Sequence, residues 1–190
     1  MSTQTAMNEN EFTSSNLEEM YSAEEITKRV KEFGEQISKD YADSKELVLV
    51  GVLKGSCVFM ADLMRAIDLP MAIDFMAVAS YKGTQSTGDV EILKDLTKSI
   101  RGKDVIVCED IVDTGLTLTR LIEILGTRGA NSIKIATLLD KPEPRINKDL
   151  KIDYCGFTIP NKFVVGYGLD VDGRFRNLPF IAVVIDPEKL

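Results

Sequence analysis

Three carboxylates beside a short run of hydroxylated residues give this sequence its clearest chemical signal. Glu109 and Asp110 are adjacent, Asp113 follows three residues later, and residues 114–117 read T-G-L-T. Turn-forming residues at a helix N-terminus present backbone N–H groups that bind anions such as phosphate. Adjacent carboxylates instead suit hydroxyl groups or hydrated Mg²⁺. The segment therefore calls for a ligand that carries a phosphate together with hydroxyls, a cation, or both.

A ribose 5-phosphate meets both demands, because its vicinal hydroxyls suit the carboxylates and its phosphate suits the N–H groups. Two other interpretations stay open from these residues alone. Mg²⁺-dependent phosphatases and response regulators also place an acidic pair after a strand. Asp113 and Thr114 could equally cap a helix, since Asp and Thr side chains accept hydrogen bonds from the N–H groups of a first turn.

The acidic segment lies between a predicted strand and a predicted helix. Residues 105–108 form a short, mostly β-branched apolar run, which is typical of a buried strand. After the segment, apolar residues recur with helical spacing at Leu118, Leu121, Ile122 and Leu125. The carboxylates are therefore expected at the point where a strand ends and a helix begins.

The rest of the chain predicts alternating strands and helices. Ser22 and Glu25 have the spacing of a capping box, at the start of a helix that runs to about residue 41. A second helix follows the segment 54–56, which reads K-G-S. Strands are predicted at 47–53, 71–80, 91–96, 132–139, 152–159, 163–167 and 180–185.

Successive strand-to-helix crossovers imply a parallel sheet with helices on its faces. The predicted fold class is therefore α/β, a single domain with a central, mainly parallel sheet flanked by helices. Ligands of such sheets bind at the carboxyl ends of the strands, where Lys54, Glu109 and Lys141 fall. The segment 81–90, with two glycines and several hydroxyls, has no apolar periodicity and is expected to be a mobile loop or a solvated hairpin.

Composition excludes several classes of function. The chain has 190 residues and a net charge of −7, which disfavours wholesale binding to nucleic acid or to an anionic membrane. It has no histidine, which excludes Ser-His-Asp and Cys-His catalysis. The three cysteines lie in apolar runs and are expected to be reduced core residues of a cytoplasmic protein. Residues 1–16 are polar, do not read as a signal peptide, and are expected to be a disordered extension.

The segment E-D-I-V-D-T-G-L-T resembles the signature of the type I phosphoribosyltransferases, which bind 5-phosphoribosyl-1-diphosphate. Other motifs between about Tyr21 and Ile185 are similar to one branch, the bacterial hypoxanthine-guanine phosphoribosyltransferases. In chain order they read V-L-K-G-S, S-Y-K-G-T, L-L-D-K-P, N-K-F-V-V-G-Y-G-L-D and R-F-R-N-L-P. The resemblance implies the type I phosphoribosyltransferase fold over residues 17–190. A small hood from the N-terminal helix region and the C-terminal segment would cover its active site.

The resemblance also implies roles for the residues that bind the sugar. Glu109 and Asp110 would hold the ribose hydroxyls and orient Mg²⁺. Asp113 would be the catalytic acid/base at purine N7. The 5-phosphate would be bound by Asp113, Thr114, Gly115, Leu116 and Thr117. Leu116 departs from the basic or polar residue that is frequent there in relatives, which should cost little because the phosphate is held mainly by backbone donors.

Further implied roles concern the diphosphate and the purine. Lys54, Gly55 and Arg176 would bind the diphosphate, with a cis peptide bond between Leu53 and Lys54. On the purine side, Lys141 would donate to the 6-oxo group and Phe163 would stack on the base. Val164 would meet the edge that carries the 2-substituent. Asp170, also on this side, would be a second Mg²⁺ ligand. Ser80 and Tyr81 would begin the mobile loop. Residues 171–173 depart from the aromatic and longer polar residues expected after Asp170.

The implied function is purine salvage. The 5-phosphoribosyl group would pass from phosphoribosyl diphosphate to hypoxanthine or guanine, giving IMP or GMP and diphosphate. Relatives suggest a homodimer or homotetramer, with no nucleic-acid or membrane partner. Two rivals are a phosphoribosyltransferase for another base and a regulator that senses phosphoribosyl diphosphate while binding nucleic acid.

Overall fold

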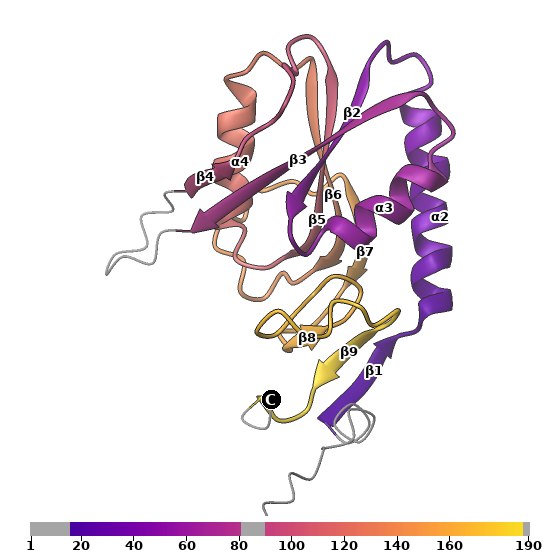
Figure 1. Cartoon of the computed structure of the whole chain (residues 1–190), viewed down its shortest axis with the longest axis vertical. Helices are drawn as coiled ribbons and strands as arrows, with labels where there is room; N and C mark the ends of the chain where they lie inside the picture. Colours follow the sequence, from indigo (N-terminus) through magenta and orange to yellow (C-terminus); the bar gives the residue numbers. More distant parts are fainter. Residues whose placement is uncertain (1–15, 81–89, 188–190) are drawn as a thin grey trace, which may run out of the picture.

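The structure, a computed structural model, describes residues 16–80 and 90–187. The strands are β1 (Leu17–Tyr21), β2 (Leu47–Leu53), β3 (Met71–Ser80), β4 (Val90–Lys94), β5 (Asp104–Val112), β6 (Ser132–Asp140), β7 (Tyr154–Thr158), β8 (Val164–Val165) and β9 (Ile181–Val184). The helices are α2 (Ala23–Asp40), α3 (Cys57–Ala66) and α4 (Leu116–Gly126). Across the described ranges these elements build two sheets (Figure 1).

The main sheet has the strand order β4-β3-β2-β5-β6-β7. All its neighbouring strands are parallel except β3 and β4, which pair antiparallel as the arms of a hairpin. Helix α3 connects β2 with β3, and α4 connects β5 with β6. The fold is therefore α/β with a mainly parallel central sheet, as predicted.

Two apolar clusters pack against the main sheet. Helices α2 and α3 contribute to one cluster, for example through Phe33 and Phe59, whereas α4 contributes Leu121 and Leu125 to the other. The capping box at Ser22 and Glu25 is present, with both of its hydrogen bonds formed. The helices therefore pack against the main sheet, as the sequence pattern predicted.

The small sheet has the order β1-β9-β8 and consists of antiparallel pairs. In Figure 1 the arrowheads of β2 and β3 point toward the end of the molecule where this sheet lies. Asn16 is buried at its edge, where its side chain bonds both the N–H and the C=O group of Asp186. The small sheet thus joins the two ends of the described chain and faces the carboxyl ends of the parallel strands.

The structure has one strand that was not predicted, and the bounds of several predicted strands differ, two of them near the site. Strand β1 was not predicted, because residues 17–21 have no apolar periodicity long enough to indicate a strand. Strand β5 continues to Val112, so Glu109 and Asp110 lie within the strand and not after it. The strand predicted at 163–167 is limited to β8, since positive φ angles at Gly166, Tyr167 and Gly168 turn the chain.

The cysteines and the helix lengths bear on the predictions made from composition. All three cysteines are free thiols, and Cys108 is fully buried whereas Cys57 and Cys155 are partly buried. None of the helices in the described ranges is long and apolar enough to span a membrane.

Candidate active site

The acidic pair is brought against the loop that follows β2. Gly55 is buried there, and a Cβ atom at this position would overlap the carboxylate of Asp110. Asp110 Oδ1 also accepts a hydrogen bond of 2.8 Å from the N–H group of Ile111. The two segments are thus in contact because residue 55 has no side chain, and the predicted diphosphate loop lies beside the predicted ribose and metal ligands.

Burial and neighbouring carboxylates raise the pKa values of the acidic pair. Burial, followed by the charges of Asp110 and Asp113, raises the pKa of Glu109 well above its ordinary value. Burial also raises the pKa of Asp110 to about 6, although the Arg176 guanidinium and backbone hydrogen bonds act in the opposite direction. A nearby cation or a set of hydroxyl donors would lower both pKa values. The pair is therefore electrostatically suited to a cationic or hydroxyl-rich ligand.

The loop between β5 and α4 has the geometry of an anion site. Gly115 is the N-cap residue of α4 with φ +75°, a conformation that glycine adopts without strain. Thr119 holds Gly115 in place, because the N–H and hydroxyl groups of Thr119 both donate to the Gly115 C=O group. The first N–H groups of a helix have no intrahelical acceptors. Residues 114–117 therefore lie at the positive end of α4, where the Thr114 N–H group already donates to Asp113.

Asp113 is exposed and does not cap the helix. Helix α4 has no side-chain hydrogen bond to its N-cap position, and the Asp113 carboxylate instead accepts a 2.6 Å bond from the N–H group of Thr114. The Asp113 side chain therefore does not cap α4, whereas the Thr114 hydroxyl accepts a long bond of 3.5 Å from the N–H group of Leu116 in the first turn. The carboxylate is left at the surface of the loop, where it can exchange a proton with a ligand.

The end of β2 adopts the backbone expected for a diphosphate loop. The Leu53–Lys54 peptide bond is cis, as the resemblance implied. Lys54 is exposed, whereas Ser56 is buried and its hydroxyl donates to the Val52 C=O group at 2.7 Å. On its other side the loop meets the small-sheet region, because a Cβ atom on Gly168 would overlap the Gly55 C=O group.

Asp170 and Arg176 are paired with each other in this structure. Arg176 Nη2 lies 2.6 Å from Asp170 Oδ1, and Arg176 Nη1 donates to the Gly168 C=O group at 2.5 Å. The other Asp170 oxygen accepts from the N–H group of Gly173 at 2.7 Å. The predicted metal ligand and the predicted diphosphate contact are thus adjacent, and a bound ligand would compete with their mutual ion pair.

The predicted purine residues also come together. Lys141 follows β6, and its Nζ atom donates to the Lys162 C=O group at 2.8 Å. The next residue, Phe163, has 46% of its surface exposed, so its ring is not part of the core. Val164 is buried in β8. An exposed ring beside a lysine can stack on a planar base while the ammonium group approaches a base oxygen.

Asp113 and Lys141 are aligned by the sheet register. Val112 pairs with Asp140 across β5 and β6, and the Lys141 N–H group extends this ladder by donating to the Val112 C=O group at 2.9 Å. Asp113 and Lys141 are therefore the next residues on two neighbouring strands. A carboxylate and an ammonium group placed in this way can approach adjacent atoms on one edge of a base.

The sequence did not reveal Arg145. Its buried guanidinium group donates to the Asp113 and Val112 C=O groups and pairs with Asp140. No local pattern distinguishes it from a surface arginine, since its acceptors come from two separate segments. The hydrogen bond between the Tyr167 hydroxyl and Asp62 in α3 was missed for the same reason.

The acidic residues fit a hydrated metal better than a fully protein-bound one. Among the described residues, no three of the types His, Cys, Asp and Glu form a group that could hold a metal by themselves. Mg²⁺ commonly keeps several waters and binds one or two carboxylates together with substrate phosphates. The oxygen donors of Glu109, Asp110 and Asp170 suit that mode. Ser80 ends β3, whereas Tyr81 and the rest of the predicted mobile loop lie outside the described residues.

The chain is similar to known proteins over most of its length. The sequence model of the family described as "Phosphoribosyl transferase domain" matches residues 16–172. The hypoxanthine-guanine phosphoribosyltransferase of Bacillus subtilis (strain 168) is 51% identical over 166 residues, which is 87% of this chain and 91% of that protein. The hypoxanthine phosphoribosyltransferase of Salmonella typhimurium is 50% identical over 171 residues, covering 89% of this chain and 96% of the relative.

Solved structures extend the likeness to the fold. A crystal structure of a hypoxanthine phosphoribosyltransferase from Staphylococcus aureus superposes with a TM-score of 0.88 at 48% sequence identity, covering 95% of this chain and 98% of that one. Sequence and fold thus agree across most of the chain. The protein described here therefore belongs to the phosphoribosyltransferase family, and its fold is the type I phosphoribosyltransferase fold.

Proposed function

We propose that this protein is a purine salvage enzyme that transfers the 5-phosphoribosyl group from phosphoribosyl diphosphate to hypoxanthine or guanine, giving IMP or GMP and diphosphate. The observation that carries this proposal is the alignment of Asp113 and Lys141 beside the anion-binding start of α4. The end of β5 thereby offers Asp113 for proton transfer and the start of α4 for the sugar phosphate. The end of the neighbouring strand β6 offers Lys141 as a cation for the base. The similarity to hypoxanthine and hypoxanthine-guanine phosphoribosyltransferases supports the same reaction.

The ribosyl donor binds along the ends of β5 and β2. Backbone N–H groups of residues 114–117 hold the 5-phosphate at the positive end of α4. Glu109 and Asp110 accept hydrogen bonds from the ribose hydroxyls. Lys54 and the Gly55 backbone hold the diphosphate. Arg176 exchanges its ion pair with Asp170 for a contact with the diphosphate.

The base binds between Lys141 and Phe163. Lys141 donates to the 6-oxo oxygen, whereas the 6-amino group of adenine is itself a donor and would be rejected. Asp113 lies beside Lys141, and N7 neighbours the 6-oxo group on one edge of the purine. Asp113 therefore holds or receives the N7 proton as N9 attacks C1 of the ribose. The Val164 backbone meets the edge that carries the 2-substituent.

A divalent metal, which we propose is Mg²⁺, fits the carboxylates of Glu109, Asp110 and Asp170. When bound it neutralises charge on the diphosphate leaving group. The chain's own residues orient the donor and supply the proton transfer. The mobile loop that the resemblance implies from Ser80 and Tyr81 onward stays a prediction, because residues 81–89 lie outside the described part of the chain.

The rest of the proposal concerns organisation. We propose that residues 16–190 form one domain and that the small sheet with the C-terminal segment is the hood. The extension predicted at residues 1–16 is wrong at Asn16, which is buried and bonded to Asp186, and residues 1–15 lie outside the described residues. We place the protein in the cytoplasm, in keeping with its free thiols. Assembly as a homodimer or homotetramer is a prediction that light scattering can check.

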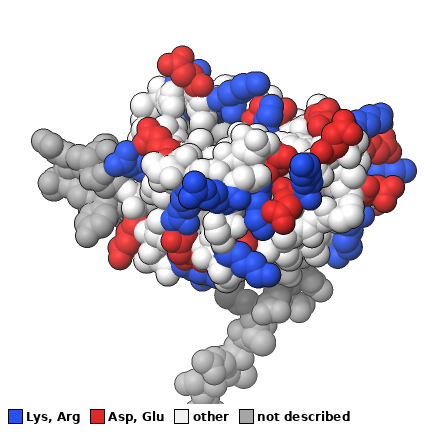
Figure 2. All heavy atoms as spheres, turned by 90° about the horizontal axis from the view of Figure 1, so that it is seen from above, with Lys and Arg blue, Asp and Glu red and all other residues white. Residues whose placement is uncertain are grey.

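A nucleic-acid-binding regulator is the weaker alternative. On the face shown in Figure 2, Lys and Arg side chains are interspersed with Asp and Glu, so this face has no continuous basic area. Nucleic-acid sites depend on such areas to neutralise phosphates. This face therefore gives no support to a nucleic-acid-binding regulator.

The proposal is tested by product formation. Purified protein with Mg²⁺ and phosphoribosyl diphosphate should convert hypoxanthine to IMP and guanine to GMP, and excess EDTA should abolish both reactions. Formation of neither nucleotide would refute the proposed activity. Tight binding of DNA or RNA at moderate salt, without turnover, would favour the regulator.

A further inference from the structure

Arg145 is a buried charge between the two loops that carry the site. It lies in the segment after β6, has 9% of its surface exposed, and reaches back to the segment after β5. Charged side chains are almost never fully buried unless they are paired. The acceptors of its guanidinium group therefore indicate its role.

The guanidinium group has three acceptors. Its Nε atom donates to the Asp113 C=O group at 2.7 Å, and Nη2 donates to the Val112 C=O group at 2.8 Å. Nη2 also pairs with the carboxylate of Asp140, the last residue of β6. Two of these acceptors are the consecutive carbonyl groups that flank Asp113. Arginine suits such a set, because its donors are fixed in one plane.

These bonds orient the backbone around the proposed acid/base. A trans peptide unit is planar, so its N–H group points opposite to its C=O group. With the Val112 and Asp113 C=O groups directed to Arg145, the N–H groups of Asp113 and Thr114 point away from the guanidinium. The Asp113 carboxylate lies on that far side, where it accepts the 2.6 Å bond from Thr114. Arg145 thereby determines on which side of the loop this carboxylate lies.

Further contacts join the same two loops. The N–H group of Ile146 donates to the Thr114 C=O group at 3.0 Å, and a Cβ atom on Gly115 would lie 3.0 Å from Arg145 Cδ. The Arg145 stem therefore also packs against the N-cap of α4. Because Asp140 immediately precedes Lys141, one side chain connects the proposed base-binding lysine, acid/base and phosphate loop.

We propose that Arg145 is a positioning residue that holds Asp113 and the N–H groups of the phosphate loop in register with Lys141. This inference rests on the proposed transferase function. Arg145 does not touch substrate in this arrangement; it acts through the backbone of the loop. If Arg145 had only a structural role, its replacement would lower stability and leave the turnover of the folded enzyme unchanged.

Two variants separate these roles. Arg145→Gln removes the charge and most of the donors, and it should lower kcat by roughly 10²-fold, since displacements near 1 Å have effects of that size. Arg145→Lys keeps a charge for Asp140 but cannot reach all three acceptors, so its kcat should lie between those of Arg145→Gln and the unaltered protein. The KM for the ribosyl donor should rise more than the KM for hypoxanthine, because the phosphate loop is displaced directly.

Arg128 provides a matched control. It follows the opposite end of α4 and makes a two-pronged pair with Asp95, at 2.6 and 2.9 Å. Arg128→Gln removes a paired arginine without touching the site and should leave kcat and both KM values unchanged. Thermal unfolding of all three variants shows how much each arginine contributes to stability.

The outcomes are distinct. Reduced kcat in Arg145→Lys, with a Tm close to that of Arg128→Gln, supports the positioning role. Unchanged kcat in a folded Arg145 variant overturns it, and so does failure of both Arg145 variants to fold, because Arg145 would then hold the fold and not the site. If the unaltered protein forms no nucleotide, the proposed function has failed. Calorimetric binding of ribose 5-phosphate, weakened by Arg145→Gln but not by Arg128→Gln, would then still support the effect on the loop.

Discussion

Three neighbouring acids have different chemistry because their surroundings differ. Glu109 and Asp110 are partly buried within β5 and their pKa values are raised, whereas Asp113 is exposed in the loop that follows. The first two are suited to bind and the third to exchange a proton. The separation of binding from proton transfer is therefore set by where β5 ends.

Asp113→Asn should lower kcat for IMP formation by about 10²–10⁴-fold, the usual contribution of a positioned acid/base. GMP binding should persist, because the N–H groups of the phosphate loop remain. Stability should change little, since Asp113 does not cap α4. Steady-state kinetics, calorimetry and thermal unfolding test this together, and a large loss of Tm with unchanged kcat would contradict it.

Asp110→Asn should remove part of the pH dependence of stability. Because the pKa of Asp110 is raised from 3.8 to about 6, the folded protein binds this proton more tightly than the unfolded chain. Ionisation as pH rises from about 4 to 6 therefore lowers the free energy of unfolding, by up to roughly 1.4 kcal/mol per pH unit. The variant lacks this loss, so its stability relative to the unaltered protein should grow across that window and level off above it. Urea denaturation in EDTA measures the difference, and a pH-independent difference would show the assignment to be wrong.

Gly55→Ala should impair binding of the ribosyl donor, because its Cβ atom would overlap the Asp110 carboxylate. We expect its KM for the donor to rise by at least about tenfold, as for a loss of ~1.4 kcal/mol of binding. Gly126→Ala is the control, since a Cβ atom at the end of α4 would meet nothing within 4 Å. Equal donor KM values in the two variants would mean that the Gly55 contact does not matter for binding.

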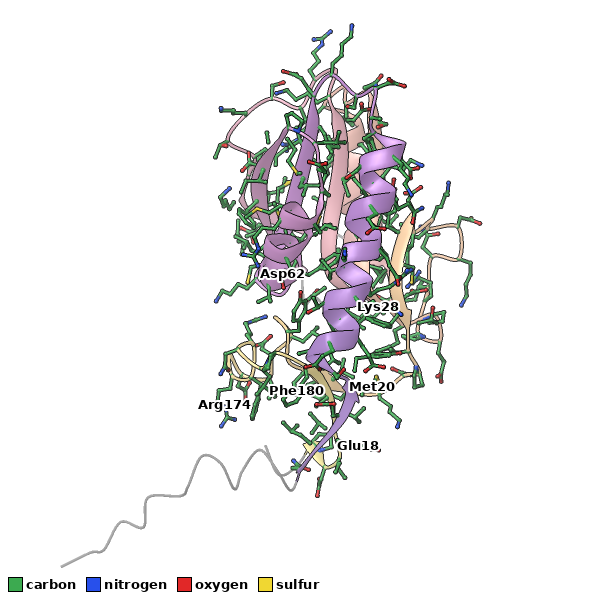
Figure 3. The ribbon with its side chains drawn as sticks, turned by 90° about the vertical axis from the view of Figure 1, so that its right-hand side faces the viewer. Glu18, Met20, Lys28, Asp62, Arg174 and Phe180 are labelled. Atoms are coloured by element: carbon green, nitrogen blue, oxygen red, sulfur yellow. The ribbon has the colours of Figure 1, made fainter. Side chains whose placement is uncertain are left out.

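At the scale of elements, strand ends and the loops between them form the site. Figure 3 shows Asp62 on α3, near the hood segment that contains Arg174 and Phe180. The Tyr167 hydroxyl donates to Asp62, which ties the turn before Asp170 to the helix that follows the diphosphate loop. Burial and the Asp62 carboxylate raise the pKa of Tyr167, so the hydroxyl remains a donor at neutral pH.

Tyr167→Phe should loosen this connection and raise the KM values of both substrates several-fold, with a smaller effect on kcat. Tyr154→Phe is the matched control, because Tyr154 likewise donates to a carboxylate, Asp40 at 2.8 Å, but away from the site. Loss of one such bond costs about 1–2 kcal/mol of stability in either variant. If the two variants had the same KM values, the Tyr167 bond would contribute to stability alone.

Sequence predicted the elements whose signals are local. The α2 cap at Ser22 and Glu25, the buried strand β2 and the helix after the acidic segment all follow from periodicity and side-chain chemistry within one stretch. Strand β1 escaped prediction because its partner β9 lies at the other end of the chain. The same holds for Arg145, whose role depends on carbonyl groups about 30 residues away. Local sequence patterns could not predict which distant segments come into contact.

At the scale of the whole molecule, the hood and the main sheet have separate tasks. The main sheet and the loops after its strands carry the proposed proton-transfer and sugar-phosphate residues, whereas Phe163, Val164 and Asp170 come from the segment after β7, in the proposed hood region. The hood is closed by pairing of β1 with β9 and by the bonds between Asn16 and Asp186. Base choice should therefore depend on how the segment after β7 meets the strand end that carries Lys141.

The central claim is that this site joins a 6-oxopurine to ribose 5-phosphate, and a base panel tests it most directly. With saturating phosphoribosyl diphosphate and Mg²⁺, kcat/KM should be measured for hypoxanthine, guanine, xanthine, adenine and uracil. Hypoxanthine or guanine should exceed adenine by at least about 10²-fold, since the 6-amino group of adenine would face Lys141 as a second donor. Uracil should be as poor a substrate, because it has no imidazole ring with an N7 proton for Asp113. A higher kcat/KM for adenine or uracil than for hypoxanthine and guanine, or no turnover of any base, would contradict the account.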